Sequence, residues 1–183
     1  MAPHSNLTPT ELLDKKGRNY LSGRFNEFFR VNKGSIDFSK LVPDHICYRC
    51  DSHESYKVLF ADLRKKAILR SIGEVNGREI SIFELPFRFE TDCGDIKLLE
   101  LCDQKLDNSQ IEGFEHIEFA VADKRDYWII QGQFQKLYKD MVEKQSNERT
   151  TFEVKLATDM TFIVELEPIM ETIARRERLA EKK

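Results

Sequence analysis

Two short segments of the chain pair an acidic residue with a histidine in the same pattern. Asp44-His45-Ile46 opens one stretch of strand-like residues, and Glu115-His116-Ile117 opens another. A glutamate follows each histidine at a similar distance, Glu100 after 55 residues and Glu165 after 49. Imidazole nitrogens and carboxylate oxygens are common ligands of divalent metal ions. If the four strands line one concave surface, the sequence predicts a metal site made of His45, Glu100, His116 and Glu165.

An ordinary structural role is the alternative for each of these residues. A strand histidine beside an acidic residue is more often a hydrogen-bonded structural histidine than a ligand, and alternating glutamates usually form a solvated face. Here each glutamate stands in an apolar run, Leu-Leu-Glu-Leu or Ile-Val-Glu-Leu, whose other residues must face a core. Because histidine and glutamate both recur, the metal site is favoured. The expected cofactor is a divalent ion (Zn, Ni, Fe, Co or Mn), and the ligand set does not choose among these.

Composition limits the kinds of protein this chain can be. Its 183 residues, 40% hydrophobic and 33% charged, are enough for one domain or for two small fused modules. A net charge of −3 disfavours a nucleic-acid partner, which would require a basic surface. No apolar run approaches the ~20 residues that span a bilayer, and the first residues do not look like a secretory signal. We therefore expect a cytoplasmic monomer or homodimer with a small-molecule ligand, no nucleic-acid partner and no membrane contact.

The four cysteines do not have the spacing of a disulfide framework. Cys47 and Cys50 form a C-x-x-C pair, which is typical of redox and zinc sites. Both fall on a predicted strand, where residues three apart point to opposite faces. We therefore interpret them as buried, small apolar residues.

The predicted elements form a repeat of one strand, one helix and three strands, flanked by a helix at each end. Thr8-Pro9-Thr10-Glu11 is a capping box that opens the first helix. The repeat predicts an α+β fold of two tandem βαβββ modules with extra terminal helices. The predicted division is an N-terminal helical extension (1–43, with its helix at 9–31), module one (44–103), a linker (104–112), module two (113–167) and a C-terminal helix (168–183, helical over 169–181).

Local signals place the elements within each module. In module one, an acidic cap at Asp51 opens a helix that ends near Lys66, and Asn76-Gly77 predicts a hairpin turn. In module two, Asp123 is expected to cap a helix, and the polar residues 144–149 suggest that its first hairpin has been trimmed. The predicted strands are 44–50, 68–74, 79–89, 96–102, 114–121, 151–156 and 160–166.

Several of these residues resemble the YecM family, small bacterial proteins of the vicinal oxygen chelate superfamily. The resemblance is carried by Asp44-His45-Ile46 with Arg49-Cys50, by Asn76-Gly77-Arg78, and most specifically by the segment from Glu112 to Glu118. It implies a vicinal oxygen chelate (glyoxalase-like) fold, in which two modules curl around a shared metal site, with His45, Glu100 and His116 matching the family pattern. Glu165 departs from that pattern, which has a histidine before a proline near the end of the last strand. Glutamate there makes the set resemble that of glyoxalase I.

This resemblance and the ligand set together suggest a divalent-metal-dependent enzyme of isomerase, lyase or dioxygenase type. Its substrate would be a small metabolite with carbonyl or carboxylate oxygens, bound next to the metal ion. Glu165 or Glu100 would move a proton as a general base. Arg49 would bind a substrate carboxylate, or alternatively form an ion pair with Glu118 or Glu167. Two further functions stay open, namely a non-catalytic small-molecule or metal-binding module, and an interaction protein that kept the fold without the chemistry.

Overall fold

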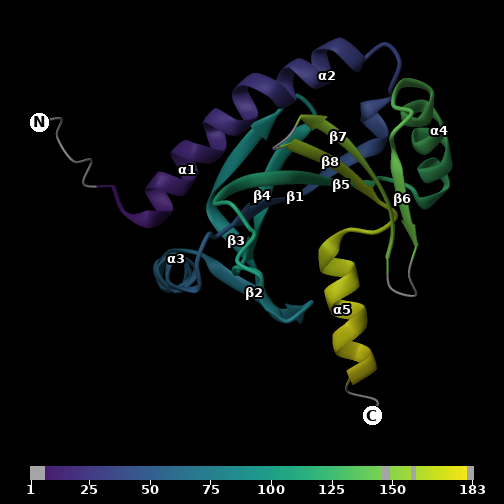
Figure 1. Cartoon of the computed structure of the whole chain (residues 1–183). Coiled ribbons are helices and arrows are strands. Elements are labelled where there is room, and N and C mark those ends of the chain that lie inside the picture. The colour runs from purple at the N-terminus through teal and green to yellow at the C-terminus, as the bar shows by residue number, and fades with distance from the viewer. Residues whose placement is uncertain (1–6, 146–148, 158–159, 181–183) are drawn as a thin grey trace, which may run out of the picture.

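A single mixed sheet organises the chain (Figure 1). The computed structural model describes residues 7–145, 149–157 and 160–180. Its eight-stranded sheet has the order β2-β3-β4-β1-β5-β8-β7-β6. The strands are β1 (Leu41–Arg49), β2 (Ile68–Val75), β3 (Arg78–Thr91), β4 (Gly94–Cys102), β5 (Gly113–Val121), β6 (Val142–Gln145), β7 (Thr150–Ala157) and β8 (Met160–Glu165).

The sheet consists of two halves with the same topology. In each half the first strand pairs in parallel with the last, β1 with β4 and β5 with β8. The halves join at the centre, where β1 and β5 run antiparallel. With α3 (His53–Lys66) and α4 (Tyr127–Leu137) after the first strand of each half, the order is βαβββ twice. The predicted α+β fold of tandem βαβββ modules is confirmed, while the exact residue boundaries of the modules stay a prediction.

The N-terminal segment covers one face of the sheet. It comprises α1 (Pro9–Tyr20), a π-helical turn (Leu21–Phe25) and α2 (Asn26–Asn32), so the predicted helix over 9–31 is interrupted in its middle. The Thr8 capping box is present as predicted. The π turn adds one residue to its turn, which keeps Leu21 and Phe25 buried on the same side as the rest of the helix.

The hydrophobic core fills the space between this segment and the sheet. Alternate residues of β5, Ile117 and Phe119, face this core, and so do Phe162 and Val164 of β8. Phe119 and Phe162 stack with ring centroids 4.9 Å apart. Because strand residues alternate between faces, the residues between them are turned to the opposite face of the sheet.

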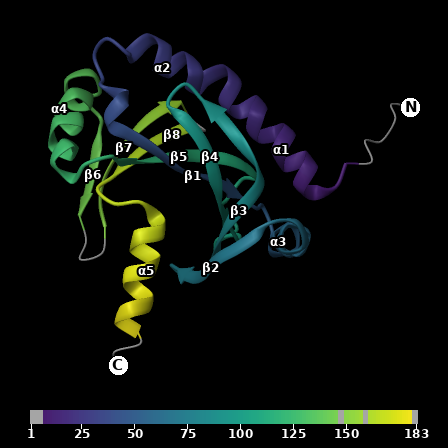
Figure 2. The same ribbon diagram turned by 180° about the vertical axis from the view of Figure 1, so that it is seen from behind.

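The C-terminal helix α5 (Ile169–Ala180) lies on that opposite face, away from α1 and α2, as the two views in Figures 1 and 2 show. Ile169 and Ile173 pack against Ile82 of β3, and Leu98 of β4 is partly buried against them. No helix in the described part of the chain is both long and apolar enough to cross a bilayer.

Two local predictions were wrong, and one strand was not predicted. Ser52, not Asp51, caps α3 and forms a capping box with Ser55. Asp123 caps a short 3-10 turn (Lys124–Asp126), and α4 begins only after it. The first hairpin of module two is trimmed as suggested, with four residues in β6 against eight in β2, but the strand β6 itself, which pairs with β7, was not predicted. All side chains of β6 are exposed, so this edge strand lacks the apolar alternation that would reveal it in the sequence.

Gly17 marks the closest approach of α1 to the sheet. A Cβ atom at this position would lie 2.4 Å from Cε1 of Phe89 and 3.0 Å from Cζ of Phe114. We expect Gly17→Ala to lower the free energy of unfolding by about 1–3 kcal/mol, because the aromatic rings must shift to admit the methyl group. Urea denaturation measures this change. Gly132→Ala in α4 is the control, because a methyl group there would meet no atom within 4 Å and alanine favours helix. Equal stability of both variants would contradict this packing.

Candidate metal centre

Two bulges in the β1–β5 pairing bring the acid–histidine pairs together. The register shifts between Pro43 and His45, where β1 carries an extra residue, and again between Ile46 and Tyr48, where β5 carries one. Such a bulge re-aims side chains next to it. Here each bulge lets an acidic residue and the histidine after it turn to the face opposite the core.

Each histidine is held by the acidic residue that precedes it. His45 Nδ1 lies 3.1 Å from Asp44 Oδ2, and His116 Nδ1 lies 2.7 Å from Glu115 Oε2. Asp44 also accepts a hydrogen bond of 2.8 Å from the backbone N–H of Ile169, at the start of α5. A carboxylate on Nδ1 fixes the ring and leaves Nε2 as the free nitrogen, which is the usual arrangement of a metal-binding histidine.

Both Nε2 atoms are buried and, among the described residues, have no hydrogen-bond partner. Two carboxylates face them. Glu118 Oε1 lies 3.6 Å from His45 Nε2 and 3.2 Å from His116 Nε2. Glu100 lies 3.8 Å from each, through Oε2 to His45 and through Oε1 to His116. Donors bound at 2.1 Å to one tetrahedral ion would be about 3.4 Å apart, so these separations match those of metal ligands.

The electrostatics of the cluster favour a cation. Burial alone would lower the pKa of His116, but its contact with Glu115 and the negative charge of Glu118 and Glu100 outweigh this effect and raise the pKa to about 10. The pKa of His45 is also raised, because Glu118 and Asp44 outweigh its burial. Burial would raise the pKa of Glu118, yet the histidines and Arg149 hold it far below its usual value. The carboxylates therefore bind positive charge strongly.

Glu165 is placed differently from the other three predicted ligands. It forms an ion pair with Arg149, whose guanidinium also donates to Glu118 at 2.7 Å. Among the described residues, His45, Glu100 and His116 form a cluster with ligand atoms within 4.8 Å of one another, and Glu165 joins no such cluster.

The strand registers explain this position. In module one, Glu100 pairs with Cys47, two residues after His45. In module two, Glu165 pairs with Ala120, four residues after His116, and Ile163 pairs with Glu118. Ile163 therefore occupies the place that corresponds to Glu100, and Glu165 lies one pleat further along its strand. Its role as a ligand stays a prediction.

Arg49 has a partner that the sequence did not suggest. It forms an ion pair with Glu115, so the predicted alternative partners, Glu118 and Glu167, were wrong. Glu118 pairs with Arg149, and Glu167 with Lys124 and Arg175. The Arg49 side chain is 27% exposed and the Arg149 side chain 32%, so both cations stand between the buried cluster and solvent.

Sequence reasoning missed Glu118 and Arg149 as members of this site. Glu118 could have been found, because it stands two residues after His116 and must share its face in a strand. Arg149 precedes β7 and lies outside the repeated histidine and glutamate segments, so that pattern did not point to it. The acidic residues before each histidine were part of the repeated pattern, but their role as partners of Nδ1 was not assigned.

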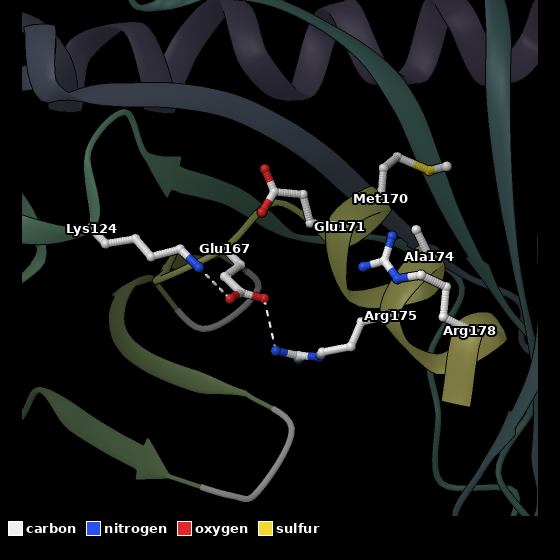
Figure 3. A pocket seen from close by; sticks show the side chains of 7 residues that line it. All are labelled: Lys124, Glu167, Met170, Glu171, Ala174, Arg175 and Arg178. Carbon is white, nitrogen blue, oxygen red and sulfur yellow. Dashed lines mark hydrogen bonds and ion pairs between the residues drawn. The ribbon is translucent and has the colours of Figure 1, made fainter. Parts of the chain in front are cut away.

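A separate pocket of about 550 Å³ lies between Lys124 and α5, and none of the clustered residues lines it (Figure 3). Glu167 takes ion pairs from both Lys124 and Arg175 inside this pocket, the second at 3.0 Å. The carboxylate of Glu167 is therefore already paired with two cations of the same chain.

Comparison with known proteins identifies the family of this chain and agrees with its fold. The sequence matches the family model described as YecM protein over residues 24–169, which include every residue of the cluster. The chain belongs to the YecM family. A relative described as an uncharacterized protein of Haemophilus influenzae is 37% identical over 89 residues, 48% of this chain and 46% of that protein. The match thus spans about half the length of this relative.

Solved structures show the fold that this YecM-family chain shares. The structural-genomics protein EC4020 superposes with a TM-score of 0.67 and 20% identity over 86% of this chain and 89% of that one. At this identity the likeness concerns the fold alone. A variant of glyoxalase I from Zea mays gives a TM-score of 0.43 with 16% identity, over 69% of this chain and 44% of that one. The predicted membership in the YecM family is confirmed by the family match.

Proposed function

We propose that this YecM-family protein binds a divalent metal ion through His45, Glu100, His116 and Glu118 and is a metal-dependent enzyme. The observation that carries the proposal is the pair of buried Nε2 atoms that face two carboxylates and, within the described part of the chain, lack hydrogen-bond partners. A buried polar atom without a partner is costly, and a bound cation removes that cost. Two imidazoles and two carboxylates suit Zn²⁺, Fe²⁺, Co²⁺, Ni²⁺ or Mn²⁺.

The substrate that fits is a small metabolite with neighbouring carbonyl, hydroxyl or carboxylate oxygens. A divalent ion held by this set would act as a Lewis acid on a substrate oxygen, as isomerases, lyases and dioxygenases require. Arg49 and Arg149 are partly exposed cations beside the cluster, and we assign them to binding and orienting a substrate carboxylate.

We assign proton transfer to Glu165. Its side chain is 2% exposed and lies beside Arg149, which also contacts Glu118, so it stands one side chain away from the cluster. Glu100, the other candidate base, faces both Nε2 atoms and is needed as a ligand. A carboxylate beside the cluster that is not itself a ligand can take up a proton from a bound substrate.

Metal binding is tested directly by thermal unfolding. A ligand bound only by the folded state at one hundred times its Kd stabilises it by about 2.7 kcal/mol. For a chain of this size, we therefore expect Zn²⁺, Ni²⁺ or Fe²⁺ to raise the Tm of tag-free protein by roughly 5–10 °C, reversibly with a chelator. An unchanged Tm with all three ions would contradict the proposal and favour an interaction protein without metal chemistry.

Turnover is tested separately with metal-loaded protein. The panel would contain 2-oxo acids, 2-hydroxy ketones and catechols, with products followed by NMR. We expect conversion of at least one compound by the loaded protein and none by the metal-free protein. A compound that binds the loaded protein and is recovered unchanged after long incubation would favour a non-catalytic binding module.

A further inference from the structure

We propose a second metal site in this protein, formed by Cys47, Cys102 and Glu100 and suited to a thiophilic ion such as Zn²⁺ or Cd²⁺. It shares Glu100 with the metal centre proposed above but uses two thiols that this centre does not use. Thiolate sulfur selects soft ions, so the two sites differ in the ions they prefer.

The two sulfur atoms are placed by the parallel pairing of β1 and β4. Cys47 pairs with Glu100, and Cys102 pairs with Arg49, two residues further along each strand. Cys47, Glu100 and Cys102 therefore share one face of the sheet. Cys47 lies directly beside Glu100 and diagonally across from Cys102. Their ligand atoms all lie within 4.8 Å of one another.

The separations match those of ligands on one ion. The sulfur atoms of Cys47 and Cys102 are 3.6 Å apart, and Cys102 Sγ lies 3.3 Å from Glu100 Oε1. Two thiolates bound at 2.3 Å to a tetrahedral ion would be about 3.8 Å apart. A disulfide requires about 2.05 Å between its sulfur atoms, and both cysteines are free thiols.

The surroundings of this pair differ from those of an ordinary buried cysteine. Cys47 and Cys102 are 1% and 0% exposed, yet neither belongs to the apolar clusters of the core. Cys50, by contrast, is part of the main core cluster. Cys47 instead lies within 4.8 Å of ligand atoms of Glu115 and His116. The thiol pair is thus enclosed on the polar face of the sheet, among other potential ligands.

Glu100 is oriented to serve both sites. Its Oε2 faces His45 Nε2 at 3.8 Å, while its Oε1 faces both His116 Nε2 at 3.8 Å and Cys102 Sγ at 3.3 Å. A carboxylate whose oxygens lie within reach of both ligand groups can bridge neighbouring ions in a two-metal site. The arrangement assigns the sulfur pair to an ion next to the histidine centre.

The test is a Cd²⁺ titration of tag-free protein purified under reducing, oxygen-free conditions. Cadmium bound by thiolates gives a charge-transfer absorption in the ultraviolet. We expect this band to saturate at one Cd²⁺ per chain, and Cys47→Ser and Cys102→Ser each to remove it or to weaken Cd²⁺ binding at least tenfold. Cys93→Ser is the matched control, because Cys93 is half-buried and belongs to none of the ligand clusters of the described residues. Melting curves of these variants and of Cys102→Ala show whether a loss of the Cd²⁺ band comes from misfolding.

The result separates this proposal from the proposed function. His45→Ala is expected to lose Ni²⁺ binding and to keep the Cd²⁺ thiolate band, because His45 belongs only to the histidine centre. A band of full intensity in Cys47→Ser, or no band in the wild type with all thiols reduced, would overturn the sulfur site. Either result leaves the Ni²⁺ measurement free to support or contradict the histidine centre.

Discussion

His116→Ala is expected to abolish stoichiometric Ni²⁺ binding at the histidine centre. The substitution removes a buried Nε2 atom that faces Glu118 at 3.2 Å and Glu100 at 3.8 Å. Removing the carboxylate that hydrogen-bonds a metal-binding histidine typically lowers metal affinity 10–100-fold. Removing the histidine itself should therefore lower metal affinity by at least about 100-fold. Elemental analysis of tag-free protein and competition with a chromophoric chelator measure the stoichiometry and the Kd.

His53→Ala provides the matched control for this experiment. His53 also has a carboxylate partner, with Nδ1 2.6 Å from Asp103, but its side chain is 62% exposed and it belongs to no ligand cluster of the described residues. Its loss should leave the metal content unchanged. Full Ni²⁺ content in His116→Ala would exclude His116 as an essential ligand and with it the proposed centre.

Glu118→Gln and Glu165→Gln are expected to separate binding from turnover. Glu118 contacts both Nε2 atoms, so its amide variant should lose at least about 100-fold in metal affinity. Glu165 contacts Arg149 and joins no cluster of the described residues, so its variant should keep the metal. If Glu165 is the base, its variant should lose about 100-fold or more of any turnover, the usual effect of removing a positioned base.

The opposite pattern would change the ligand assignment. Metal loss in Glu165→Gln, with metal retained in Glu118→Gln, would favour the set first predicted from the sequence, namely His45, Glu100, His116 and Glu165. Because Glu118 is buried between cations, melting curves of both variants are needed to separate metal loss from unfolding.

Local signals were sufficient to predict most of the fold. The Thr8 capping box and the Asn76-Gly77 turn specify their own geometry, and the repeated acid–histidine segments identified the duplication. Edge strand β6 escaped detection because its side chains are all exposed. The π turn after α1 depends on how the helix packs against the sheet, which no local pattern reports.

The site was harder to predict than the fold, because it depends on register. His45, Glu100 and His116 were found from their types and spacing, and the structure brings them together. Similar separations along the chain suggested that Glu165 corresponds to Glu100, but pairing across β5 and β8 places it one pleat further on. The bulges at Asp44 and Glu115 depend on strand pairing, which the sequence of one strand does not contain.

The seam between β1 and β5 divides the proposed ligands evenly. His45 and Glu100 belong to the first half of the chain, and His116 and Glu118 to the second. Each half would then supply only two of the four ligands. The ion would hold the two halves together by binding ligands from both. If the chain is cut between the halves, the two fragments should therefore associate with higher affinity when metal is supplied.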